Sequence, residues 1–140
     1  MRIDWRLIAA VAVGGALGSV VRYLLGAFIQ DRVPIGLPVG TLVINVAGSL
    51  LLGFFMTLSL ETTAITPEMR FFLTTGFCGG FTTFSTFSYE TYRLIEDAEY
   101  GTAGLYAVAS VVLSVFACAL GMGAARRMVG ARPSAGADRT

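Results

Sequence analysis

Four apolar blocks account for most of this chain of 140 residues, and they restrict it to a membrane-spanning fold. Two of them, residues 33–60 and 100–125, contain no charged residue and exceed the roughly 20 residues that cross a bilayer as a helix. The hydrophobic fraction of 55% and the charged fraction of 14% are far from the averages of soluble proteins. We therefore predict an all-α membrane protein with four transmembrane helices, at about residues 5–29, 37–60, 70–93 and 101–125.

These blocks predict a single domain over residues 1–126, followed by a short tail. The tail, residues 127–140, is rich in glycine, alanine, proline and serine, a composition typical of disorder. The first block follows Arg2 and Arg6 as the apolar part of a signal peptide would, but it continues for a full span and three more blocks follow. Thr66 and Pro67 are placed to begin the third helix.

The third block differs from the others because glycines interrupt it. Residues 71–89 carry no charge, yet Gly76, Gly79 and Gly80 lie close together and are followed by alternating phenylalanine and hydroxyl residues. Each glycine weakens a helix by about 1 kcal/mol relative to alanine, so we expect a break near the centre of this helix. Freed backbone at membrane depth must be satisfied by protein, water or an ion, which makes a broken helix a candidate ion or substrate site.

The chain offers little for catalysis. It contains no histidine, which is the commonest general base and metal ligand. Cys78 and Cys118 lie on different predicted helices without the spacing of metal ligands, and both are typical of small buried apolar side chains. Ser85 and Ser88 have no base to activate them as nucleophiles. We predict that the protein is not an enzyme and uses no organic cofactor.

Neutral polar side chains recur within the predicted spans. No carboxylate occupies the middle of a span, and the one charge there is Arg22. Hydroxyl and amide donors near an arginine suit an anion better than a cation. A small four-span proton-coupled exporter, which usually needs an intramembrane carboxylate, stays the alternative. The neutral polar residues are Asn45, Ser49, Thr82, Thr83, Ser85, Thr86, Ser88, Ser110 and Ser114.

Phe81, Phe84 and Phe87 recur every three residues and are expected to share one side of the helix. The edge of an aromatic ring carries partial positive charge, so rings facing a narrow passage can replace part of the water around a small anion. Spacing alone leaves a second interpretation open, in which the rings pack against neighbouring helices or face lipid.

Three segments of the chain together resemble the Fluc (CrcB) fluoride channels. The glycine-rich segment 76–88, GFCGGFTTFSTFS, is similar to the family nearly letter for letter. Segment 14–23, GGALGSVVRY, and segment 40–49, GTLVINVAGS, resemble two further motifs of the family in the same order and spacing. The resemblance covers all four predicted spans, roughly residues 5–126.

The resemblance implies an architecture and a function. Proteins of this family form antiparallel, dual-topology dimers of four-helix subunits, with two fluoride pathways along the interface. A homodimer in lipid is therefore expected, acting as a passive channel through which cytoplasmic fluoride leaves the cell and causes less toxicity. The expected location is the inner membrane of a bacterium, as a multi-pass protein, and no nucleic acid partner is expected.

The resemblance also implies roles for single residues. Asn45 matches a polar pore residue, and Phe84 and Phe87 match the aromatic cluster whose ring edges contact fluoride. The helix break resembles the site of a central structural sodium ion (Na+), held by the backbone carbonyls of Gly79 and Thr82 from both subunits; such carbonyls are hard oxygen ligands. A β-branched residue in place of Gly79 is excluded if its backbone has positive φ. The other implied pathway residues are Thr83, Ser85, Tyr106, Ser110, Ser114 and Arg22.

Several polar or small residues keep a second interpretation. Asn45 could join two helices by hydrogen bonds, and Ser110 and Ser114 could bond back to carbonyls of their own helix. Gly14 and Gly18 form a small-xxx-small pair, which favours helix packing over a place in a pore.

Charge placement predicts the orientation of the helices. All ten basic residues are arginine, and if both termini are cytoplasmic, Arg32 and Arg93 are the two that lie outside. The positive-inside rule favours this orientation. A chain that pairs with an inverted copy of itself should have nearly balanced charge, so pairing with an oppositely oriented homologue is the alternative to the homodimer. Arg22, within the first span, either extends to the membrane surface or attracts fluoride at a vestibule. The cytoplasmic arginines on this assignment are Arg2, Arg6, Arg70, Arg126, Arg127, Arg132 and Arg139.

Overall fold

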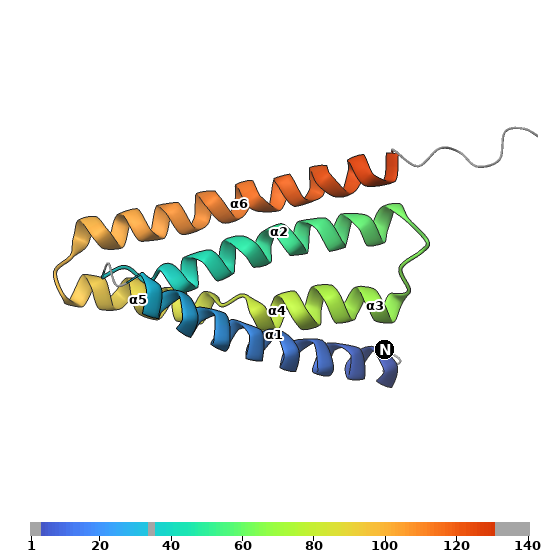
Figure 1. The fold of residues 1–140 in the computed structure, drawn as a ribbon, viewed down its shortest axis with the longest axis horizontal. Coiled ribbons are helices and arrows are strands. Elements are labelled where there is room, and N and C mark those ends of the chain that lie inside the picture. Colours follow the sequence, from blue (N-terminus) through green and yellow to red (C-terminus); the bar gives the residue numbers. More distant parts are fainter. Residues whose placement is uncertain (1–3, 34–35, 131–140) are drawn as a thin grey trace, which may run out of the picture.

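The computed structural model describes residues 4–33 and 36–130, and every regular element in that part of the chain is helical (Figure 1). Three helices are long and apolar enough to cross a membrane, as expected for a membrane protein. They are α1 (Trp5–Arg32), α2 (Val39–Glu61) and α6 (Tyr100–Gly130).

The third apolar block forms a series of shorter elements that run beside the long helices (Figure 1). No single helix covers it. The series consists of α3 (Pro67–Phe71), the π-helical segment η1 (Phe72–Cys78), α4 (Gly79–Phe81) and α5 (Phe84–Glu96).

The predicted C-terminal boundary of the domain differs from the end of the last helix. Helix α6 continues to Gly130, so the expected boundary after residue 126 falls inside a helix. An uninterrupted run of apolar and small residues leads into Arg126 and Arg127, and neither arginine disfavours a helix. Residues 131–140 of the predicted tail lie outside the described residues, as do Arg2, Arg132 and Arg139.

Side-chain caps begin three of the helices. Asp4 Oδ1 accepts the Arg6 N–H of α1 at 2.9 Å. Thr66 Oγ1 accepts the Met69 N–H at 3.2 Å, with Pro67 at the first position of α3, as the sequence predicts. Thr83 caps α5 in the same way. Each cap satisfies an N–H that the helix cannot pair internally.

Helix α1 packs closely against η1 and α4 through its glycines. A Cβ on Gly14 would collide with the Phe72 carbonyl oxygen, and one on Gly18 would collide with the Phe77 carbonyl oxygen. The backbones therefore approach to a distance that only glycine permits. The expectation that Gly14 and Gly18 serve packing is confirmed.

Much of the apolar surface of α6 stays exposed in the single chain. Val108, Val111, Val112 and Val115 are each more than half exposed, whereas the buried side chains of this helix are small, Tyr106 excepted. Apolar surface of this extent belongs against lipid or against another subunit.

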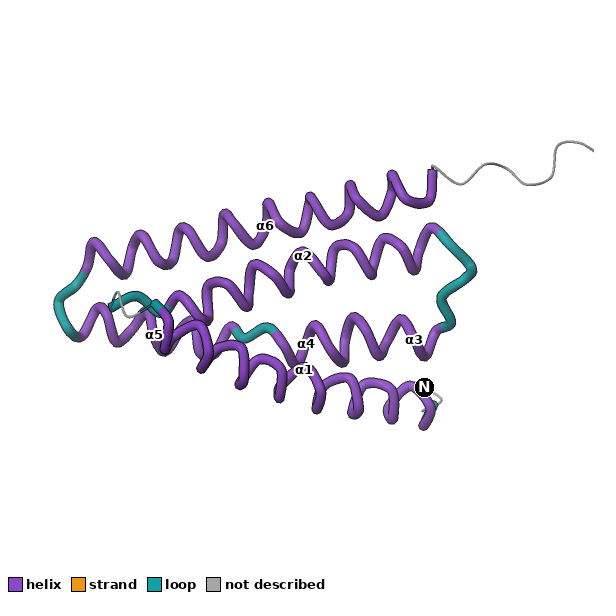
Figure 2. The backbone as a smooth tube through the Cα atoms, in the orientation of Figure 1, coloured by secondary structure: helices purple, strands orange, loops and turns teal. Residues whose placement is uncertain are grey.

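The start of α1 and the end of α6 lie at the same end of the bundle (Figure 2). Arg6 and Arg126 are thus at this end, and Arg32 and Arg93 are at the other. This arrangement agrees with placing both termini on one side of the membrane. An exposed ion pair joins the ends of α2 and α6, with Arg126 Nε 3.4 Å from Glu61 Oε1.

The packing of α1 predicts different outcomes for two neighbouring glycines. We expect Gly18→Ala to destabilise the fold by about 1–3 kcal/mol, because its Cβ meets backbone atoms that cannot move aside. Thermal unfolding in detergent, followed by circular dichroism, measures this. Gly15→Ala is the matched control, since its Cβ would lie 3.8 Å from the nearest atom, the Gly76 carbonyl oxygen. Equal stability of the two variants would contradict the close approach.

Candidate functional site

The chain leaves helical geometry at two consecutive residues between α4 and α5. Thr82 has φ −81° and ψ 157°, and Thr83 has φ −150° and ψ 111°, so both are extended (teal segment in Figure 2). In an uninterrupted helix, the N–H groups of Thr83 and Thr86 would bond the carbonyls of Gly79 and Thr82. Here both N–H groups bond side-chain oxygens instead.

Gly79 itself has right-handed helical geometry, with φ −64° and ψ −38°. The conditional expectation of a positive φ there is wrong, and an added Cβ would lie 4.0 Å from the nearest atom, the Thr74 carbonyl oxygen. The neighbouring glycines are required for another reason, which is the approach of α1. A Cβ on Gly80 would collide with the Gly15 carbonyl oxygen, and one on Gly76 would lie 3.0 Å from Gly14 Cα.

Asn45 of α2 pairs with the backbone at the break through both ends of its amide. Its Nδ2 donates to the Thr83 carbonyl at 3.0 Å, and its Oδ1 accepts the Thr83 N–H at 2.8 Å. Two backbone groups that the broken helix leaves unpaired are thereby satisfied inside an apolar span. The side chain therefore joins two helices, and it also lies at the candidate site.

Arg22 of α1 contacts the break from the opposite side. Its Nε donates to the Gly80 carbonyl at 3.1 Å, and Ser19 Oγ donates to the same oxygen at 3.4 Å. Neither of the two sequence interpretations of Arg22 includes a bond to a backbone carbonyl. The helix break is therefore held by side chains of α1 and α2 together.

A hollow of 260 Å³ adjoins the break between α2, α5 and α6. The Ser110 hydroxyl in its wall is buried and has no hydrogen-bond partner among the described residues. Because buried polar groups are normally paired, this oxygen points to a bound water or ligand. The back-bonding interpretation does not hold for Ser110. Six residues predicted for the pathway line the hollow, together with Ser49, Leu52, Thr82 and Val111; the six are Asn45, Thr83, Phe84, Phe87, Ser110 and Ser114.

Two of the three phenylalanines of the predicted stripe reach this hollow. The Phe84 and Phe87 ring centroids are 5.6 Å apart with the planes tilted by 44°, and Phe84 is 78% exposed in the single chain. Phe81 is instead buried and stacks on Phe77, with 5.8 Å between the centroids. The stripe is divided because the extended residues at the break interrupt the helical period on which it rests.

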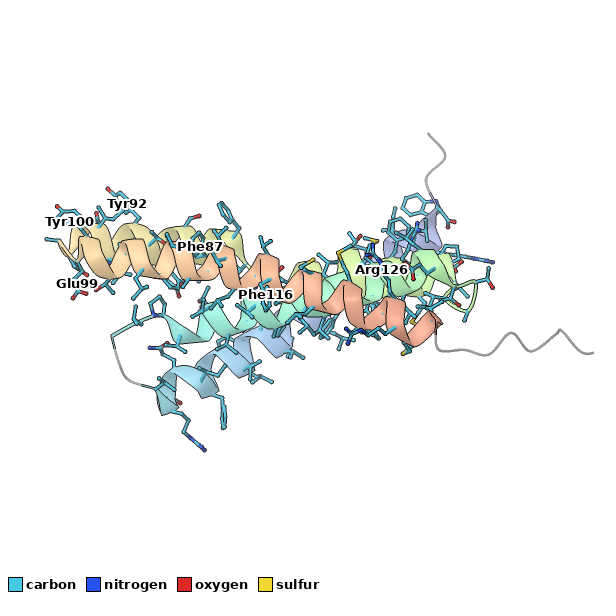
Figure 3. The ribbon with its side chains drawn as sticks, turned by 90° about the horizontal axis from the view of Figure 1, so that it is seen from above. Phe87, Tyr92, Glu99, Tyr100, Phe116 and Arg126 are labelled. Atoms are coloured by element: carbon cyan, nitrogen blue, oxygen red, sulfur yellow. The ribbon has the colours of Figure 1, made fainter. Side chains whose placement is uncertain are left out.

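Sequence reasoning assigned Tyr106 to the pathway but missed the polar cluster that it forms with Glu90 and Thr41 beside Phe87; Phe87 is labelled in Figure 3. The Tyr106 ring lies 5.4 Å from the Phe87 ring, and its hydroxyl donates to Glu90 Oε2 at 2.7 Å. Thr41 Oγ1 donates to Glu90 Oε1 at 2.8 Å. The hydropathy pattern places Glu90 at the end of a span, but it lies one turn after Phe87 on the same face of α5. That spacing is the signal that could have placed it near the site.

Three predicted pathway residues, Ser85, Arg22 and Tyr106, are not among the described residues that line this hollow. Ser85 is exposed, and its Oγ is 3.3 Å from Thr83 Oγ1. Arg22 lines a second hollow of 260 Å³, together with Thr41, Thr86 and Thr83. Thr83 is thus common to both hollows.

Within residues 4–33 and 36–130, no group of three or more acidic, cysteine or histidine side chains could hold a metal ion. Backbone carbonyls at the break are further oxygen ligands that a hard cation accepts. Gly79 and Thr82 can supply such ligands, because the N–H partner of each carbonyl in a continuous helix is bonded elsewhere.

Comparison with known proteins identifies the family of this chain. A family model described as CrcB-like protein, Camphor Resistance (CrcB), matches residues 9–122, which include all the elements around the break. The chain belongs to the CrcB family. The resemblance found in the sequence is confirmed.

Curated relatives in this family are similar over nearly their whole length. A protein of Geobacter metallireducens is 50% identical over 121 residues, covering 86% of this chain and 98% of the relative. Proteins of Nitrobacter winogradskyi and Thermus thermophilus are 49% and 48% identical over 120 residues, with 86% of this chain and 95% of each relative covered. All three are named fluoride-specific ion channel FluC. The prediction that this CrcB-family chain is not an enzyme is confirmed.

The pairing of Asn45 with Thr83 predicts how the break responds to substitution. We expect Asn45→Ala to cost roughly 1–3 kcal/mol, because it leaves the Thr83 N–H and carbonyl without partners. Hydrogen exchange followed by mass spectrometry should show faster exchange in the peptide that contains Thr83. Ser49→Ala, which removes a hydroxyl from the same hollow and leaves the pairing in place, serves as the control. Unchanged exchange in Asn45→Ala would contradict this role.

Proposed function

We propose that this protein is a fluoride channel, which lets cytoplasmic fluoride leave the cell passively and so reduces its toxicity. The observation that carries the proposal is the hollow at the helix break, whose wall includes the unpaired, buried Ser110 hydroxyl. Family membership and the names of the relatives support the same function. The relatives are bacterial proteins, which supports the inner membrane of a bacterium as the location.

The lining of the hollow suits a small anion that must give up water. Hydroxyls of Ser49, Ser110 and Ser114 can donate hydrogen bonds, and the edges of Phe84 and Phe87 offer partial positive charge. No charged side chain is among the described residues that line it. Neutral donors compensate for part of the lost hydration without holding the ion tightly, and conduction requires both properties.

A polar route leads away from this hollow past the break. The second hollow, which Arg22 lines, shares Thr83 with the first. It shares Thr41 with a third hollow of 540 Å³, which reaches Arg93 near the end of α5 and is also lined by the carboxylates of Glu90 and Asp97. We propose that fluoride follows these hollows, attracted by the guanidinium of Arg22.

An antiparallel homodimer would complete the pathway. The large exposed fraction of Phe84 and the exposed Val111 beside it leave one side of the hollow open in the single chain. A second subunit packed there would bury these side chains and contribute its own rings to the wall. The third apolar block would then cross the membrane beside α1, α2 and α6, which makes four spans, and its break would lie at the dimer interface. We propose that the two subunits are copies of this chain in opposite orientations, and pairing with an oppositely oriented homologue stays the alternative.

We also propose a structural sodium ion at the break. The carbonyls of Gly79 and Thr82 would hold it, each subunit contributing both oxygens. When bound, the cation supplies positive charge that lowers the cost of bringing anions into the membrane.

A proton-coupled exporter of another substrate is not favoured. Such a protein needs a carboxylate where its substrate binds, whereas the described lining of the first hollow contains none. The relatives are named as channels.

Fluoride efflux from liposomes that contain the purified protein tests the proposed function. We expect rapid fluoride efflux and no chloride efflux above that of protein-free liposomes. Uptake of an organic cation driven by a pH gradient, without fluoride efflux, would instead identify an exporter.

Substitution of the ring edges tests the pathway within the channel. We expect Phe84→Ile and Phe87→Ile to lower fluoride efflux by about tenfold or more, equivalent to ~1.4 kcal/mol on the barrier, while folding is retained. Isoleucine keeps approximate bulk but loses the electropositive edge. Phe28→Ile, on α1 and outside the described lining of the hollow, is the matched control. Efflux near the wild-type rate in both pathway variants would refute the assignment.

Removal of sodium tests the proposed cation. In choline chloride instead of sodium chloride, we expect a lower unfolding temperature, restored by sodium in a saturable manner. Mass action gives about 2.7 kcal/mol at a sodium concentration 100-fold above the Kd. Thr82→Ser should behave like the wild type, because the ligand is a backbone oxygen. The same unfolding temperature in both salts would exclude a bound sodium ion.

A further inference from the structure

A groove of 400 Å³ runs between α2 and α6, away from the helix break. Leu50 and Phe54 of α2 form one wall, and Leu120, Gly123 and Ala124 of α6 form the other. A Cβ on Gly123 would meet nothing within 4 Å, so the groove is open at its surface there. Both helices are long and apolar enough to span a membrane, so this groove lies at bilayer depth.

The groove ends at an arginine. Arg127 lines it one helical turn beyond Gly123, near the end of the bundle that carries the last turn of α6 (Figure 1). The neighbouring Arg126 is already paired, with its Nε 3.4 Å from Glu61 Oε1. Within residues 4–33 and 36–130, Arg127 has no ion pair. A guanidinium in the last turn of a membrane-spanning helix binds phosphate oxygens well, because its planar fork can donate two hydrogen bonds at once.

We propose that this groove binds one anionic phospholipid, with an acyl chain over Gly123 and Ala124 and the headgroup phosphate on Arg127. An acyl chain is flexible and apolar, so it matches a narrow apolar groove open along one side. The phosphate then lies about one turn, roughly 5.4 Å, further along α6. Arg6 and Arg70, at the same end of the bundle, add positive potential that favours anionic lipid over zwitterionic lipid.

An inverted second subunit is a poorer occupant of the groove. It would bring its acidic turn, residues 96–99, to the level of Arg127. That turn is polar, so it matches Arg127 but not the apolar walls that Leu50 and Leu120 form. A lipid matches both the apolar walls and the arginine.

Native mass spectrometry of the purified protein tests the proposal. The protein is equilibrated with equal amounts of phosphatidylglycerol and phosphatidylcholine in detergent, and the retained lipid is counted. We expect the wild type to retain phosphatidylglycerol at least fivefold over phosphatidylcholine. Arg127→Gln should abolish this preference, and Gly123→Leu should lower the retention of both lipids at least fivefold, because leucine fills the groove.

Two matched controls separate the groove from general effects of the substitutions. Arg93→Gln removes an arginine at the opposite end, and Gly104→Leu makes the same change at another open glycine of α6. Both should retain lipid like the wild type, and fluoride efflux should stay unchanged in Arg127→Gln. Undiminished preference for phosphatidylglycerol in Arg127→Gln would overturn the proposal. Equal loss of lipid in Gly104→Leu, or displacement of the lipid by millimolar inorganic phosphate, would do so too.

Discussion

The pairing between the Asn45 amide and the Thr83 backbone is the interaction on which the site depends. Two extended residues inside an apolar span leave backbone groups that lipid cannot satisfy, and each such group would cost several kcal/mol. Asn45 satisfies the N–H and the carbonyl of Thr83 at once. Arg22 and Ser19 satisfy the Gly80 carbonyl. Because these side chains come from α1 and α2, the break exists only in the folded bundle.

The positions at which glycine is required follow from the same constraint. For the side chains of α1 to reach the broken segment, the two backbones must come close. Gly14 and Gly18 on one side, and Gly76 and Gly80 on the other, permit that approach. Glycine is used here for the absence of a side chain, and Gly79 shows that no unusual backbone angle is needed. Packing and polar chemistry are thus two aspects of one contact.

Apolar length and glycine spacing were enough to predict the helical membrane fold and the position of the candidate site. Thr83, Phe84, Phe87 and Ser110, which the family resemblance assigned to the pathway, line one hollow, and their role in conduction stays a prediction. Three features could not be predicted, because each depends on contacts between distant helices. They are the bond from Arg22 to Gly80, the hydrogen bonds of Glu90 with Thr41 and Tyr106, and the separation of Phe81 from the other rings. Periodicity carries no information across a break whose geometry is set by tertiary hydrogen bonds.

The bond between Arg22 and Gly80 joins residues that are 58 positions apart, which has a consequence for synthesis. Helix α1 leaves the ribosome well before its carbonyl partner is made. During that interval the guanidinium must donate its hydrogen bonds to water or lipid headgroups, so it holds the C-terminal half of α1 near an aqueous surface. The final depth of the first helix is therefore settled only after the third apolar block has entered the membrane. In this chain, insertion and tertiary folding cannot be separate steps.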